Sequence, residues 1–146
     1  TRILDFGCGT GESGAYLAET FPGATVLGVD TAENAIQLAE RRHGSPSIRF
    51  GPLEAVKGEA PFDLCYVNGV FHHIEPYHRL AAAVGIYDAL APGGHFALFE
   101  NNPWNPGTRM VMRRIPFDRD AITLSFVETQ RLVRQAGFQT PGSARF

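Results

Sequence analysis

Three features that mark other protein classes are scarce in this chain of 146 residues. It has two cysteines, Cys8 and Cys65, without the spacing of a disulfide framework or a metal site, so we expect a reducing, cytoplasmic setting. The net charge is −2 and no basic run stands out, which argues against a nucleic-acid partner. The apolar run from Leu80 to Phe99 is interrupted by Asp88 and by a Pro-Gly-Gly turn, which argues against a membrane span.

What is present is an alternation of strand and helix signals. Short apolar runs predict strands at 3–6, 25–30, 47–50, 62–68 and 95–100. Apolar spacing, capping residues and breakers predict helices at 12–21, 32–42, 76–91 and 126–136. Strands that are apolar throughout and alternate with helices indicate an α/β fold: a doubly wound, mostly parallel sheet with helices on both faces.

Two of the predicted helices carry more detailed signals. In the helix that begins at Pro76, one apolar face is marked by Leu80, Val84, Tyr87 and Ala91, and the turn at 91–94 ends the helix. Ser125 and Glu128 have the spacing of a capping box, which predicts where the last helix begins. The residues after Gly137 are enough for one more strand.

The segment 101–124 does not fit the alternation. It is long and proline-containing, with helix potential around 108–114. A segment of this length between a strand and a helix is usually functional, so we expect a substrate-side insert. The length of the chain otherwise predicts one domain, 1–146.

The stretch "ILDFGCGTGESG", residues 3–14, is the strongest local signal. Glycine at alternate positions after a strand lets the backbone turn sharply and lets a ligand touch it. The helix that follows directs its free N–H groups toward the same space. We therefore expect a ligand at the loop formed by Gly7, Gly9 and Gly11.

Two ligand classes match this loop. Gly9, Gly11 and Gly14 satisfy the G-x-G-x-x-G spacing of dinucleotide sites, although the match begins two residues late. The alternative pattern is D-x-G-x-G-x-G, with Asp5 at the end of the strand. In that form, "LDFGCGTG" resembles motif I of the class I, Rossmann-like S-adenosylmethionine-dependent methyltransferases.

Four later stretches resemble the same family in the same order, and the resemblance covers nearly the whole chain. They are Asp30 at the end of the second strand, "FGPLEA" at 50–55, "FDLCYVNGVFHHI" at 62–74 and "LAPGGHFALFE" at 90–100. The resemblance implies methyl transfer from S-adenosylmethionine to a small-molecule acceptor by direct in-line displacement.

The resemblance also implies a set of cofactor-binding residues. Asp30 would accept hydrogen bonds from the ribose hydroxyls, Glu54 would accept one from the adenine amino group, and the carbonyl of Asn68 would face the methionine ammonium. Asp5 would order the glycine loop. The full set is Asp5, Gly7, Gly9, Gly11, Asp30, Thr31, Leu53, Glu54 and Asn68.

The chain departs from the family pattern in two ways. Leu53 and Glu54 stand where the family has Gly-Asp, and the longer side chain of Glu54 shifts the geometry of that contact. The family's N-terminal helix and final antiparallel strand have no counterpart, so the domain is expected to be truncated at both ends.

The acceptor side is predicted with alternatives. His72 and His73 follow the fourth strand, and one of them acts as a general base or both serve packing and loop hydrogen bonding. Adjacent histidines on a loop seldom converge on one ion, so we predict no metal. Trp104 and Arg109 line an acceptor pocket, or belong to core and solvated surface. A binding module without catalysis and an NAD-dependent reductase remain the competing functions.

Overall fold

A computed structural model describes residues 1–112, 114 and 121–139, with the side chains of 108, 109 and 111 outside the described part. The strands are β1 (Arg2–Phe6), β2 (Thr25–Asp30), β3 (Ile48–Pro52), β4 (Phe62–Asn68) and β5 (Leu90–Phe99). The α-helices are α1 (Glu12–Thr20), α2 (Glu33–His43), α3 (Val56–Glu59), α4 (Pro76–Ala89), α5 (Pro106–Met112) and α6 (Phe126–Gln135). Two 3-10 turns are η1 (Leu53–Ala55) and η2 (Phe71–His73).

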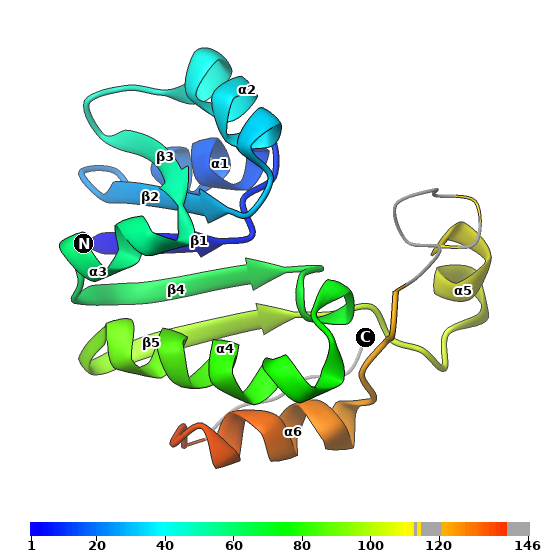
Figure 1. Cartoon of the computed structure of the whole chain (residues 1–146). Helices are drawn as coiled ribbons and strands as arrows, with labels where there is room; N and C mark the ends of the chain where they lie inside the picture. Colours follow the sequence, from blue (N-terminus) through cyan, green and yellow to red (C-terminus); the bar gives the residue numbers. More distant parts are fainter. Residues whose placement is uncertain (113, 115–120, 140–146) are drawn as a thin grey trace. The chain divides into compact units, whose positions relative to one another are not determined.

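Within the described residues, five strands form one sheet in the order β3-β2-β1-β4-β5 (Figure 1). β1 pairs in parallel with β2 and β4, β2 pairs in parallel with β3, and the arrows of β4 and β5 point the same way. The strand order reverses between β1 and β4. In such sheets, ligands bind beyond the carboxyl ends of the strands at this switch point. The predicted α/β, mostly parallel sheet is therefore confirmed.

Contacts divide the chain into two units. The first comprises residues 1–68 and 88–98, with nearly all of the sheet and helices α1 to α3. The second comprises residues 69–87 and those from 99 onward, with most of α4, α5 and α6. The glycine loop and the end of β4 both lie in the first unit.

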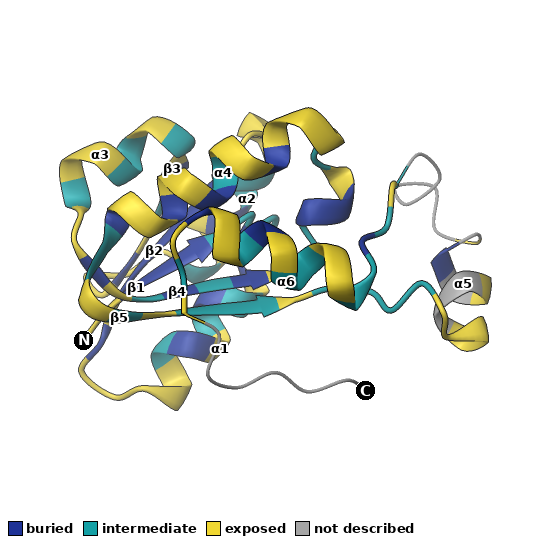
Figure 2. Cartoon of the chain, turned by 90° about the horizontal axis from the view of Figure 1, so that it is seen from below, coloured by how far each residue is buried: buried dark blue, intermediate teal, exposed yellow. Residues whose placement is uncertain are grey.

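The first unit is held together by apolar residues from its strands and from α1. Ile3, Leu17, Val26 and Ile48 are buried and form one cluster. Burying each such side chain contributes about 1.5–3 kcal/mol. Figure 2 shows the buried residues along β1 and β2, with exposed residues on the outer sides of the helices. Helices α1 and α2 contact each other and the strands β2 and β3, so they cover the same face of the sheet.

Several predicted elements agree with the structure. β2 and β4 have the predicted bounds, α1 ends one residue earlier than predicted, and α2 starts and ends one residue later. The capping box is formed: the N–H of Glu128 donates to Ser125 Oγ at 3.3 Å, and the N–H of Ser125 donates to Glu128 Oε2 at 2.7 Å. β3 starts and ends slightly later than predicted, and α3 was not predicted. The extra strand predicted after Gly137 falls mainly on 140–146, outside the described residues.

The predicted apolar face of α4 was wrong. Leu80, Val84 and Tyr87 are 41%, 37% and 46% exposed, whereas Arg79 and Ala83 on the neighbouring face are buried. Arg79 donates through Nε to the carbonyl of Ile74 at 2.9 Å and through Nη2 to the carbonyl of Ile122. These bonds direct the Arg79 face inward. Apolar spacing alone did not reveal that an arginine stem belongs to the buried side.

The predicted turn at 91–94 was also wrong, because β5 begins at Leu90 and continues through Pro92 and Gly93. β5 is the last strand in the sheet order, so one of its sides lacks a partner strand in the described sheet. An edge strand tolerates a proline whose missing N–H would point away from the ladder. Gly93 adopts φ +82°, which a residue with a side chain seldom does.

Candidate functional site

The glycine loop is bound to the end of β2 through its backbone. The N–H groups of Gly7 and Cys8 both donate to the carbonyl of Val29, at 2.8 and 3.0 Å. Gly7, Gly9 and Gly11 all have positive φ, of 78°, 53° and 93°. This left-handed conformation explains why glycine alternates here.

The space beside these glycines differs from one to the next. A Cβ atom on Gly9 would meet nothing within 4 Å. A Cβ atom on Gly11 would lie 2.9 Å from both Ala39 and the ring of Phe50. The Phe50 ring would also be 3.3 Å from a Cβ on Gly14 and 2.5 Å from one on Gly28. One aromatic ring from β3 therefore leaves little or no room for a side chain at three glycines, whereas the space beside Gly9 is open.

Asp30 stands at the end of β2 beside this open side. Its Oδ2 accepts the N–H of Gly9 at 2.8 Å, and its Oδ1 accepts the N–H of Ala32 at 2.9 Å. A carboxylate has about four acceptor positions, so each oxygen retains capacity for a further donor. The bond to Gly9 was not predicted, because it depends on two residues 21 positions apart.

Asp5 lies beneath the loop and is 2% exposed. Its Oδ2 accepts the hydroxyl of Ser13 at 2.6 Å, which joins β1 to the start of α1. Burial raises the pKa of Asp5 to about 6, and the charge of Asp30 adds to the rise. The hydrogen bonds from Ser13 and from the Gly14 backbone act in the opposite direction.

The thiols of the first unit are not reactive. Cys8 and Cys65 are both buried and unbonded to each other. Burial, together with the charges of Asp5 and Asp30, raises the pKa of Cys8 to about 12, and burial also raises the pKa of Cys65. Both groups therefore stay protonated at neutral pH.

The other predicted cofactor residues lie at the same edge of the sheet. Asp30 pairs in register with Pro52, so η1 with Leu53 and Glu54 starts beside the end of β2. Leu53 is half-buried, while Thr31 and Glu54 are exposed. Asn68 is exposed at the end of β4, which pairs with β1. The chain thus brings the predicted set to the carboxyl ends of β1, β2, β3 and β4.

In the second unit, His72 and His73 differ in surroundings. His72 is buried, and its Nδ1 lies 2.7 Å from Oε2 of Glu100. His73 is exposed, and its ring centroid lies 4.2 Å from that of His72. From the sequence, Glu100 was weighed only as a weak candidate for a metal ligand and was not included among the site residues. An acid placed directly after an apolar strand was the available signal.

The predicted acceptor residues are only partly described. Trp104 is 82% exposed, and its backbone N–H donates to Asn102 Oδ1 at 3.0 Å. Arg109 belongs to α5, but its side chain lies outside the described residues. Their role in an acceptor pocket therefore stays a prediction.

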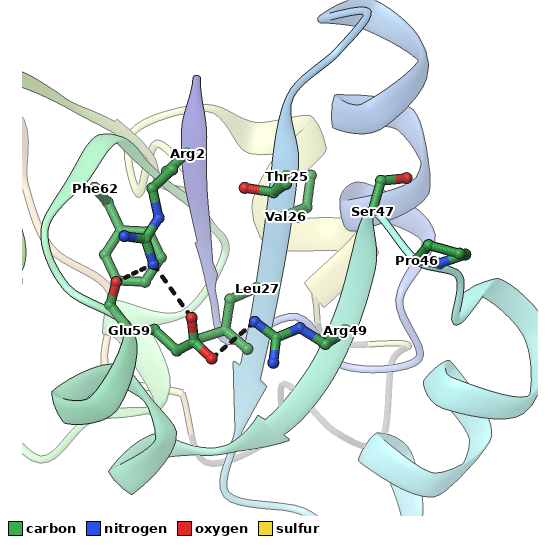
Figure 3. Close-up of a pocket in the computed structure, with 9 residues that line it drawn as sticks. All are labelled: Arg2, Thr25, Val26, Leu27, Pro46, Ser47, Arg49, Glu59 and Phe62. Atoms are coloured by element: carbon green, nitrogen blue, oxygen red, sulfur yellow. Dashed lines mark hydrogen bonds and ion pairs between the residues drawn. The ribbon is translucent and has the colours of Figure 1, made fainter.

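A pocket lies at the opposite edge of the sheet, at the amino ends of the strands (Figure 3). Arg2 and Arg49 point into it from β1 and β3, and both bind Glu59, with Nη2–Oε distances of 3.2 and 2.7 Å. The glutamate neutralises part of the arginine charge. Because this pocket holds none of the predicted site residues, we assign it no part in the site.

The described residues show neither a metal site nor a membrane span. No three or more histidine, cysteine, aspartate or glutamate side chains lie together as a metal site there. Among the same residues, no helix has both the length and the apolar character that crossing a bilayer requires.

Comparison with known proteins agrees with this architecture. Residues 4–96 match the model of the family described as "Methyltransferase domain". The chain is 37% identical to trans-aconitate 2-methyltransferase of Deinococcus radiodurans over 99 residues, which cover 66% of this chain and 36% of that protein. It is 32% identical to demethylmenaquinone methyltransferase of Thermus thermophilus over 124 residues, 81% of this chain and 55% of that one.

The fold also matches a solved structure. An S-adenosylmethionine-dependent methyltransferase from Archaeoglobus fulgidus superposes with a TM-score of 0.78 at 19% identity, over 95% of this chain and 61% of that one. The present chain spans between about a third and somewhat over half of the two curated relatives. The family match covers the sheet, the glycine loop and Asp30. The chain belongs to the methyltransferase-domain family, the class I S-adenosylmethionine-dependent methyltransferases.

Proposed function

We propose that the protein transfers a methyl group from S-adenosylmethionine to a small organic acceptor. The observation that carries this proposal is the open side of Gly9 next to the fixed carboxylate of Asp30, at the switch point of the sheet. Neighbouring glycines are filled by Phe50, so the loop is not simply loosely packed. The open side of Gly9, next to Asp30, therefore leaves room for a ligand against the loop backbone.

The residues present fit this cofactor. Asp30 has unused acceptor positions for two ribose hydroxyls, and its orientation is fixed by Gly9 and Ala32. Glu54 on η1 would accept from the adenine amino group, with Thr31 and Leu53 beside it. The carbonyl of Asn68 would face the ammonium group. When bound, S-adenosylmethionine supplies a methyl group that its sulfonium already activates, so the chain's own task is positioning, worth up to about 7–11 kcal/mol of a barrier.

For the acceptor, we propose a small organic anion. Support comes from the relative named for trans-aconitate, a tricarboxylate, and from the arginines at 109, 113, 114 and 119 in the predicted insert. A carboxylate oxygen is already deprotonated at neutral pH and needs no general base. If an acceptor does have to lose a proton, the exposure of His73 favours it over the buried His72. We also propose a reducing compartment, because Cys8 and Cys65 remain thiols.

Calorimetry and a transfer assay test the proposal together. Titration with S-adenosylmethionine should give saturable binding, and titration with NAD should give none. Incubation with methyl-labelled cofactor and trans-aconitate should then label the acid. Binding of the cofactor without transfer to any of a panel of small acids would favour a binding module. Binding of NAD alone would favour a reductase and contradict the proposal.

A further inference from the structure

Glu100 follows β5 directly, and its carboxylate is occupied on both oxygens. Oε1 accepts the N–H groups of Val70 and Phe71, at 3.0 and 2.7 Å. Oε2 lies 2.7 Å from Nδ1 of His72. The side chains of Glu100 and His72 are only 7% and 3% exposed. Three consecutive residues after β4 are therefore held by one buried acid.

This arrangement determines where His72 carries its proton. An ionised carboxylate only accepts hydrogen bonds, so a contact of 2.7 Å requires Nδ1 to be the donor. Oε1 of the same carboxylate already accepts two backbone N–H groups, so the acid acts as an acceptor on that oxygen as well. His72 therefore has a proton on Nδ1, and the orientation of its ring is set by Glu100.

Further bonds hold the same short loop. The carbonyl of His72 accepts the N–H of Ile122 at 2.8 Å, and the N–H of His73 donates to the carbonyl of Val70 at 2.9 Å. Arg79 binds the carbonyls of Ile74 and Ile122. The loop is thereby bound to Glu100 and to residue 122 within the second unit.

This number of buried polar contacts is more than a simple connection needs. A buried hydrogen bond adds only about 0.5–1.5 kcal/mol to stability, because its groups lose their hydrogen bonds to water on folding. Such contacts do, however, fix the positions of the groups that they join. The residue whose geometry they fix is His73, whose ring stacks at a tilt of 52° on that of His72 and is exposed.

We propose that Glu100 is a positioning residue for the acceptor side: through His72 and the amides of residues 70 and 71, it holds His73 in one place. The inference rests on the proposed function only for what His73 faces, an acceptor molecule. The geometric half of the proposal, that Glu100 fixes the positions of His72 and His73, does not depend on the proposed function.

Nitrogen NMR of histidine-labelled protein tests the geometric half. In the wild type, the His72 ring should have a protonated Nδ1. In Glu100→Gln, the amide oxygen can still accept the two backbone N–H groups, while its NH2 group faces Nδ1. The proton of His72 should then move to Nε2, and the His73 ring signals should shift. A wild-type His72 without a proton on Nδ1, or His73 signals that do not change, would overturn the proposal.

The functional half is tested by turnover. With S-adenosylmethionine and trans-aconitate, Glu100→Gln should lower turnover at least tenfold while the Kd for the cofactor changes less than twofold. Glu128→Gln removes one charge from the same unit at an exposed helix cap and serves as the matched control, with both quantities within twofold of wild type. Unchanged turnover in Glu100→Gln would refute positioning. If Glu100→Gln does not fold, Glu100→Asp, which keeps the charge but shortens the reach, should give the same losses.

The two proposals fail in different ways. If wild-type protein methylates no acid in the panel, the proposed acceptor class fails, and the NMR comparison still decides the role of Glu100. If the wild type is active and Glu100→Gln is equally active, the positioning role fails and the proposed function stands.

Discussion

At the scale of single residues, Asp30 has two roles, of which the sequence predicted only one. It fixes the glycine loop through Gly9 and faces the open space beside it. Sequence motifs predicted an acid at this position for ribose binding. The hydrogen bond to Gly9 became visible only in the folded chain, and it changes how a substitution should be designed.

We predict that Asp30→Ala lowers the affinity for S-adenosylmethionine by about 1.5–3 kcal/mol, because a charged acceptor is lost and Gly9 loses its partner. Asp30→Asn retains one oxygen for the N–H of Gly9 and should lose less. Calorimetry on the folded variants measures both. Asp63→Ala, which removes an acid at the far end of the sheet that accepts the N–H of Arg2, is the control and should bind normally. Equal affinity in Asp30→Ala and wild type would disprove the assignment.

Asp5 is predicted to make stability depend on pH. Its folded pKa of about 6 lies above the ordinary 3.8, so between these values the folded state holds a proton that the unfolded state has released. The stabilisation of the folded state that comes from this bound proton is fully present below about pH 4 and is lost as the pH rises through 6. The loss amounts to about 3 kcal/mol.

The measurement compares urea unfolding of wild type and Asp5→Asn from pH 4 to 7.5. Asparagine keeps an acceptor for Ser13 but does not titrate. The free energy of unfolding of the wild type should fall relative to the variant as the pH rises. A difference between the two proteins that is independent of pH would show that Asp5 titrates normally.

At the scale of elements, the glycines of the loop between β1 and α1 are needed for two different reasons, one for packing and one for binding. Gly11 has φ +93° and no room for a side chain, since Ala39 and Phe50 occupy that space. Gly9 also has positive φ, but the space beside it is open. The alternating glycines look equivalent in the sequence and are not equivalent in the fold.

We therefore predict different outcomes for matched substitutions in this loop. Gly9→Val should weaken cofactor binding at least tenfold, with a moderate loss of stability of about 1–3 kcal/mol from the unfavourable φ. Gly11→Val should lower stability further, because overpacking adds to the same backbone strain. Chemical unfolding and calorimetry on both variants distinguish the two effects. If Gly9→Val binds normally, or destabilises more than Gly11→Val, this explanation of the loop is wrong.

At the scale of the whole molecule, the predicted functions divide between the two units. The residues proposed for the cofactor lie in the first, and those proposed for the acceptor lie in the second. Substitutions in the first unit should therefore affect cofactor binding, and substitutions in the second should affect acceptor turnover.

Trp104→Ala tests this division. The side chain is 82% exposed, so the substitution should leave the fold intact. We expect turnover of trans-aconitate to fall at least fivefold while the Kd for S-adenosylmethionine stays within twofold. Tyr16→Ala removes an exposed aromatic residue from the first unit and should change neither quantity. Loss of cofactor affinity and turnover in equal measure would place Trp104 in the cofactor site instead.

The sequence by itself determined the local features of this protein. Apolar strands between helices indicated the parallel sheet, Ser125 and Glu128 indicated the start of α6, and the D-x-G-x-G-x-G pattern located the loop. These features depend on neighbours within a few residues, where the spacing in the sequence is also the spacing in space.

Only the tertiary structure decided which groups meet across the chain. The ring of Phe50 fills the space of Gly11, Gly14 and Gly28, and Glu100 reaches back to His72. The buried side of α4 follows Arg79 because its partners include Ile122, 43 positions away. Contacts over such separations are set by how strands are ordered and how loops close. Local spacing in one sequence does not encode that order, so Gly9 could not be distinguished from Gly11 before the fold was known.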